Sequence, residues 1–166
     1  NMLNEGNHPR PSTSRGTQRL YIRLNTLHFL NSQLNSLDKT LSLSSKIVPS
    51  PHSRINNRNR QLGDSSSYFD HARSAIHVAT QHVCEVAAYR LIFMDSNSVF
   101  YGSLYVGDVA NARIRPALRT LKQNLTLLCA IVTERAQPLA LKEVMRASFE
   151  AFLMVLLAGG SSRIFF

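Results

Sequence analysis

The sequence of 166 residues has only two cysteines and no apolar run long enough to cross a membrane. Cys84 and Cys129 each lie in an apolar helical pattern, which predicts two buried free thiols and fits a reducing compartment. They suggest neither a disulfide scaffold nor a four-ligand zinc site. The longest apolar run, 151–158, falls far short of the roughly 20 residues that a spanning helix needs. Residues 1–16 also lack the apolar core of a signal peptide.

Acidic residues are scarce, because the chain has 10 Asp and Glu but 19 Lys and Arg, for a formal net charge of +9. Residues 1–64 hold nine of the cations and three of the acids, so most of the excess lies in polar sequence such as INNRNR at 55–60. This charge suggests a basic nucleic-acid-binding helical module as an alternative function. Since the segment has no interleaved aromatic residues and no recognition motif, we expect no nucleic-acid partner.

Motifs for catalysis or metal binding are also missing. No serine lies in a Gly-x-Ser-x-Gly elbow, and the GGSS sequence at 159–162 lacks the Gly-Lys-Ser/Thr ending of a phosphate loop. His71, His77 and His82 are six and five residues apart, which spreads their rings around a helix instead of stacking them. We therefore expect no catalytic residue, no cofactor and no metal site.

Helical patterns separated by polar segments make up the rest of the chain. Residues 1–18, rich in Asn, Pro, Ser and Arg, are predicted to be disordered. Leucines at intervals of three and four predict a leading helix over 19–41, followed by a Ser-, Asn- and Arg-rich linker over 42–67. Residues 68–166 are predicted to form a helical bundle. Because no stretch alternates as a strand does, the fold class is all-α, an antiparallel helical bundle.

Three long helices are predicted inside this bundle. The first is capped by Ser67 and runs to about Met94, where 95–98 breaks it before a short helix over 99–105. The second starts near Arg115 or kinks at Pro116, and its coiled-coil-like seam consists of Ile114, Leu118, Leu121, Leu125, Leu128 and Val132. The third starts near Pro138, and its predicted apolar face includes Leu141, Met145, Phe149, Phe152, Leu153 and Leu156.

A basic strip beside the leucine seam is the candidate membrane or partner face. Arg115, Arg119 and Lys122 are about one turn apart, and each cation close to an anionic membrane contributes about 1 kcal/mol. An ordinary solvated face is the alternative interpretation. Arg90 falls in the apolar phase of its helix, so we expect it to snorkel or to pair with an acid such as Asp95 or Asp108.

Two stretches of the bundle carry a resemblance to a known family. AAYRLIFMDSNSVFYGSLYVGDVANARIRPALRTLKQNLTLL and LKEVMRASFEAFLMVLLAGGSSR resemble segments of the plant-type MUN-domain proteins, which are related to the animal uncoordinated-family vesicle-priming factors. RLYIRLNTLHFLNSQLNSLDKTL extends the resemblance upstream. The resemblance implies that the bundle is part of an elongated helical rod of the tethering type, a partial MUN-like domain.

The resemblance also implies a function in exocytic membrane traffic to the plasma membrane. It implies a non-catalytic protein-interaction scaffold within a vesicle tethering or priming factor, cytoplasmic and peripheral to the plasma membrane or endomembranes. The expected partners are membrane-fusion or tethering proteins, with peripheral contact to anionic membrane. The chain begins without Met and ends in Ile164, Phe165 and Phe166, so we expect a fragment. The apolar surface of 149–157, together with these three residues, is expected to lack partners and to drive self-association.

Overall fold

The computed structural model describes residues 12–47, 69–103 and 110–158, which are helical throughout most of their length and contain no strand. The prediction of an all-α bundle is confirmed. The α-helices are α1 (Arg15–Ile47), α2 (Asp70–Tyr89), α3 (Asn97–Ser103), α4 (Ala110–Ile131) and α5 (Gln137–Ala158). A π-helical segment η1 (Arg90–Asp95) follows α2, and a 3-10 turn η2 (Glu134–Ala136) precedes α5.

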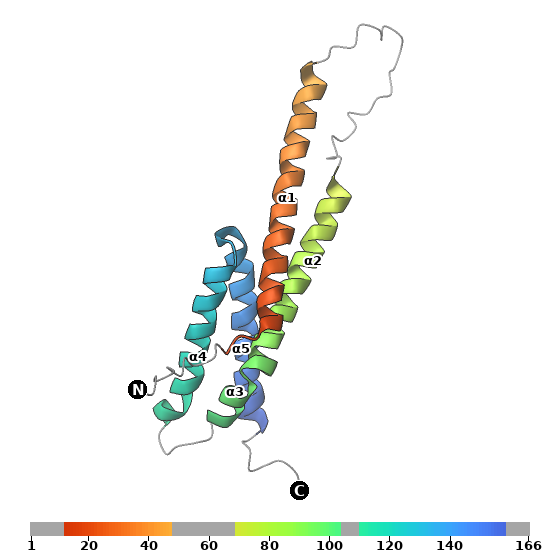
Figure 1. Ribbon diagram of the computed structural model, residues 1–166. Coiled ribbons are helices and arrows are strands. Elements are labelled where there is room, and N and C mark those ends of the chain that lie inside the picture. Colours follow the sequence, from red (N-terminus) through yellow and green to blue (C-terminus); the bar gives the residue numbers. More distant parts are fainter. Residues whose placement is uncertain (1–11, 48–68, 104–109, 159–166) are drawn as a thin grey trace, which may run out of the picture.

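The helices pack side by side, as Figure 1 shows, and the C-terminal half of α1 rises beyond the ends of α4 and α5. α2 is the main neighbour of both α1 and α5. α4 and α5 run antiparallel, because η2 leaves only a short connection between them. The core therefore lies where α1, α2, η1, α4 and α5 meet, and it includes Tyr21, Leu24, Leu91, Leu128 and Val144.

Small residues form the buried face of α5. Ala140, Val144, Ala147, Ala151 and Val155 are all buried, and their spacing of three or four residues places them on one side of the helix. On α2 the buried residues are Cys84, Ala87 and Ala88. Because the distance between two helix axes depends on the side chains at the contact, these small residues let α2 and α5 approach closely.

Most residues of the predicted apolar face of α5 are exposed instead of packed in the core. Phe149, Leu153 and Leu156 are 62%, 57% and 73% exposed, and Met145 is exposed as well. Of the predicted set, only Leu141 and Phe152 pack against the core. The reason is that only the small residues of the buried face of α5 fit against α2. The large apolar side chains point away from α2.

The predicted seam of α4 is right in its C-terminal half. Leu121, Leu128 and Val132 are buried, and Leu125 packs partly against the core, whereas Ile114 and Leu118 are exposed. α4 begins at Ala110, so the first predicted alternative, a start near Arg115, is wrong. Pro116 lies inside the helix, and a kink there, the second alternative, stays a prediction. Pro116 is the seventh residue of α4 and so lies in its second turn, where a proline leaves one intrahelical backbone hydrogen bond unmade.

α1 is longer than the predicted helix over 19–41. It begins at Arg15, because Ser14 Oγ accepts a hydrogen bond from the Thr17 N–H at 3.2 Å and thus caps the first turn. Residues 12–18 are therefore not disordered, and residues 42–47 are helical instead of linker. Residues 1–11 and 48–68, with the predicted cap Ser67, lie outside the described residues. The division of the chain into a leading helix, a linker and a bundle remains a prediction.

The predicted break after Met94 is present in a different form. α2 ends at Tyr89 and continues directly as the π-helical η1 to Asp95, so the helical run ends close to the predicted Met94 and only Ser96 separates it from the next helix. α3 starts at Asn97 instead of Val99. Its Phe100 is fully buried and packs on Phe152 with ring centroids 5.2 Å apart, which fastens this short helix to α5.

The burial pattern predicts that Leu128→Ala and Leu153→Ala differ strongly in stability. Leu128 is fully buried, so its truncation should lower the free energy of unfolding by about 2 to 5 kcal/mol. Leu153 is largely exposed, and its truncation should change stability by less than about 1 kcal/mol. Chemical denaturation followed by circular dichroism measures both. Equal losses in the two variants would contradict the observed face of α5.

Candidate partner-binding face

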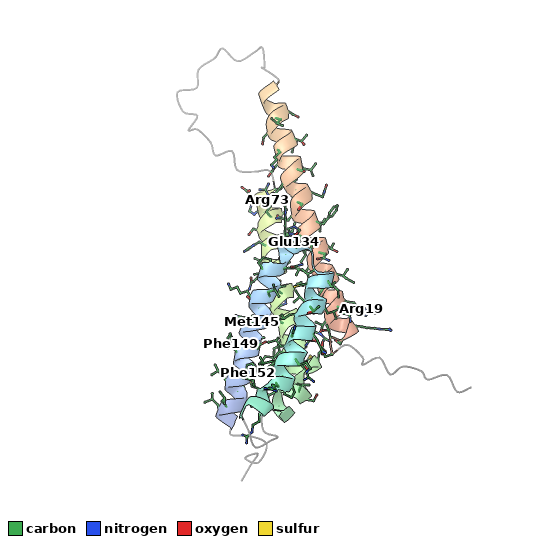
Figure 2. All side chains as sticks on the ribbon, turned by 90° about the vertical axis from the view of Figure 1, so that its left-hand side faces the viewer. Arg19, Arg73, Glu134, Met145, Phe149 and Phe152 are labelled. Atoms are coloured by element: carbon green, nitrogen blue, oxygen red, sulfur yellow. The ribbon has the colours of Figure 1, made fainter. Side chains whose placement is uncertain are left out.

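An apolar groove lies between the N-terminal half of α4 and the C-terminal half of α5. It has a volume of about 610 Å³. Nearly all of its lining side chains are apolar: Ile114, Leu118 and Leu121 from α4, and Met145, Phe149, Phe152, Leu153, Val155 and Leu156 from α5, with Arg113 and Ser148. In Figure 2 the labelled residues Met145, Phe149 and Phe152 follow one another along α5 beside α4. Phe149, Leu153 and Leu156 of the predicted apolar face therefore line an open groove, in agreement with the expected lack of partners over 149–157.

The basic strip of Arg115, Arg119 and Lys122 lies along one edge of this groove. All three side chains are exposed. Each directly follows a groove-lining residue in the sequence (Ile114, Leu118 and Leu121), and successive helical residues are about 100° apart around the axis. The strip therefore flanks the groove along the length of its α4 wall.

No negative charge offsets the strip on its own helix. The sequence of α4 contains Arg113, Arg115, Arg119 and Lys122 and no Asp or Glu. Within the described residues, none of the three strip cations forms an ion pair. The groove thus has an apolar floor and one uniformly positive edge.

A polar cluster, which the sequence did not predict, fastens the start of α1 to the bundle. Asn124 on α4 is buried, and its Oδ1 accepts hydrogen bonds from the Ser12 and Thr13 hydroxyl groups, the latter at 3.1 Å. Its Nδ2 donates to Ser96 Oγ at 3.0 Å. Because all of these partners belong to the protein itself, the cluster is structural and offers no open site.

Asp95 at the end of η1 belongs to the same cluster. Its Oδ2 accepts hydrogen bonds from the Ser14 N–H at 2.9 Å and from the Thr17 hydroxyl at 2.7 Å. The predicted pairing of Arg90 with Asp95 is therefore wrong within the described residues, because Asp95 is satisfied by the first turn of α1. The Arg90 guanidinium instead lies against Gly16, where an added Cβ would be 2.6 Å from one of its nitrogens. The other predicted acid, Asp108, lies outside the described residues.

A second polar site lies between α2 and α5. Glu143 is buried, accepts a hydrogen bond from Gln81 Nε2 at 3.1 Å and pairs with Arg146 at 2.9 Å. Burial, together with the carboxylates of Glu143 and Glu85, raises the pKa of the neighbouring Cys84 thiol to about 11. A thiol with such a pKa stays protonated near neutral pH and is a poor nucleophile.

The two cysteines differ in their environment. Cys84 is buried, as predicted, whereas Cys129 is exposed, so the prediction of a second buried thiol is wrong. His71, His77 and His82 are all exposed on α2. Within the described ranges, no three His, Cys, Asp or Glu side chains gather as metal ligands would. None of the described helices is both long and apolar enough to cross a membrane.

The fold thus brings the basic strip of α4 and the exposed apolar residues of α5 together on one surface. Sequence reasoning found the strip and expected the apolar surface over 149–157 to lack partners, but it did not place that surface beside the strip. The alanine spacing at Ala140, Ala147 and Ala151 was the signal that could have revealed which face of α5 is buried.

The environments of the two thiols predict selective alkylation. At neutral pH, iodoacetamide should modify Cys129 in the folded chain and leave Cys84 unmodified, because Cys84 is buried and protonated. In denaturant both should react. Mass spectrometry of tryptic peptides measures each site, and rapid modification of Cys84 in the folded chain would contradict its burial.

Comparison with known proteins identifies two relationships. The family model described as PATROL1-like, TPR repeats, matches residues 1–166. A protein named "Protein unc-13 homolog" from Arabidopsis thaliana is 31% identical over 154 residues, which are 90% of this chain and 14% of that protein. The chain thus spans about one seventh of the length of this curated relative. No solved structure matches the chain significantly.

Proposed function

Since the chain belongs to the PATROL1-like family with TPR repeats, we propose that it is part of a vesicle tethering or priming factor in exocytic membrane traffic to the plasma membrane. The name of the Arabidopsis relative, unc-13 homolog, supports this proposal. The chain acts as a non-catalytic protein-interaction scaffold and forms a segment of an elongated MUN-type helical rod. It works in the cytoplasm, peripheral to the plasma membrane or endomembranes.

The observation that carries the scaffold proposal is the apolar groove with its basic edge. Contiguous exposed apolar surface rimmed by polar residues is typical of a site of contact with another protein or with a membrane. Phe149, Leu153 and Leu156 supply that surface here, and Arg115, Arg119 and Lys122 add positive charge beside it. Membrane-fusion or tethering proteins are the proposed partners, with peripheral contact to anionic membrane.

The function is tested in cells with a full-length family member that contains this segment. Removing residues that correspond to α4 and α5 should lower the amount of a plasma-membrane reporter cargo that reaches the cell surface. The same deletion should reduce the fusion and tethering proteins that copurify with the full-length protein. Unchanged cargo delivery and an unchanged set of copurifying proteins would contradict the proposal.

Contact with anionic membrane predicts a salt-dependent loss of binding when the strip is reversed in charge. Replacing Arg115, Arg119 and Lys122 by Glu should weaken cosedimentation with phosphatidylserine-containing vesicles steeply at low salt, since each cation contributes about 1 kcal/mol. Helicity should be retained because the three side chains are exposed.

A matched control is available on α1, where Arg15, Arg19 and Arg23 are also exposed. Replacing these three by Glu makes the same change in net charge on another face. If both triple variants lose binding equally, net charge alone explains the attraction. If the strip variant binds vesicles as well as the unchanged chain, the strip is a solvated face.

A further inference from the structure

The groove between α4 and α5 has a shape that can accommodate a helix. Two antiparallel helices form its walls, and its volume of about 610 Å³ is lined almost entirely by side chains of Leu, Ile, Met and Phe. An amphipathic helix fills such a groove by inserting the large apolar residues of one face.

The positive charge along the groove favours partner helices that carry acidic residues. The α4 edge carries Arg115, Arg119 and Lys122, and none of the residues that line the α5 wall is acidic. Glu150, the acid on α5 nearest the groove residues in sequence, lines a different cavity, between α2 and α5. A partner in the groove therefore contacts positive charge along the α4 edge and apolar side chains elsewhere. Acidic residues on the side of the partner that faces α4 would complement this charge.

A second copy of the chain is a poorer match for the same surface. α4 has no acidic residue, and the groove face of α5 has none either, so a second groove brings no acid to the strip. The spacing of the cations along α4 suits a helical partner. Each cation directly follows a groove-lining residue, at 114 and 115, 118 and 119, and 121 and 122, so the cations repeat about once per helical turn. A helix lying along the groove can match each cation with an acid one turn after the last.

From this geometry we infer that the groove binds an amphipathic helix of a partner protein, with its apolar face on Leu118, Phe149 and Leu153 and its acidic flank on Arg115, Arg119 and Lys122. The inference deepens the proposed scaffold function by naming the chemistry of the partner, and it rests on that function for the choice of a protein as the occupant.

The experiment uses two synthetic helical peptides of about 18 residues, or five turns, as probes. Both carry leucines along one face, and they differ only in having Glu or Lys along one flank of that face. Fluorescence anisotropy measures their binding to the chain. The Glu peptide should bind about tenfold more tightly than the Lys peptide, since three exposed ion pairs each contribute a modest amount.

Two variants locate the binding. Arg119→Glu combined with Lys122→Glu should reverse the preference, so that the Lys peptide binds more tightly. Phe149→Asp should abolish binding of both peptides, because a carboxylate in an apolar groove opposes insertion of the leucine face. Circular dichroism confirms that each variant remains helical, as expected for exposed positions.

Matched controls lie on α1. Phe29 is 61% exposed, nearly the same as the 62% of Phe149, so Phe29→Asp makes the same change away from the groove. Arg19→Glu combined with Arg23→Glu repeats the charge change on α1, and Arg19 lies at the base of that helix in Figure 2. Both control variants should bind the Glu peptide as the unchanged chain does.

Several results would overturn the inference. Equal affinity for the two peptides shows apolar adsorption without charge recognition. Anionic vesicles that bind through Phe149 while neither peptide binds identify a membrane as the occupant. Oligomers that dissociate on Phe149→Asp while neither peptide binds identify a second copy.

The peptide assay is independent of the trafficking assay. If the full-length family member delivers cargo but its groove binds neither peptide, the inference fails and the proposed function stands. If the groove prefers the Glu peptide but deletion of α4 and α5 leaves cargo delivery unchanged, the proposed function fails and the peptide site stands.

Discussion

The close packing of α2 against α5 is the constraint on which the surface of this bundle depends. Ala87 and Ala88 on α2, with Ala147 and Ala151 on α5, are among the small buried residues of the two helices. Helices that meet through small side chains approach closely and leave no room for Phe or Met between them. The large apolar residues of α5 therefore lie on its other side, and the groove beside α4 is the direct result.

Polar contacts hold the longer helix α1 against this pair at several levels. Near its start, Thr13 and Thr17 bind Asn124 and Asp95. Directly after the core residue Leu24, Asn25 accepts a hydrogen bond from the Thr133 N–H and donates one to the Ile131 carbonyl, both at 2.8 Å, and so caps the end of α4. Buried polar groups are costly unless they are hydrogen-bonded, so these contacts specify one position of α1 on the bundle.

Farther along α1, ionic contacts replace apolar packing. Arg73 on α2 pairs with Asp38 on α1 and with Asp70 in its own first turn, and its Nε donates to Asn35 at 2.9 Å. These groups join α1 to α2 where α4 and α5 no longer reach (Figure 1). As a result Leu30, Leu37 and Leu41 of the predicted leucine stripe are exposed. A stripe of leucines thus needs a neighbouring element before it becomes core.

The sequence alone determined the all-α class, the approximate positions of the helices and the buried residues Leu121, Leu128 and Val132 of α4, because a 3.6-residue apolar period reports helix formation directly. It also located the strip of Arg115, Arg119 and Lys122. Only the tertiary structure decided which face of α5 is buried, that Cys129 is exposed and that residues 12–18 have a defined structure. Periodicity marks the apolar side of a helix but does not say whether a neighbour requires small or large residues there. That choice depends on the distance between packed helices, which the sequence of one helix does not contain.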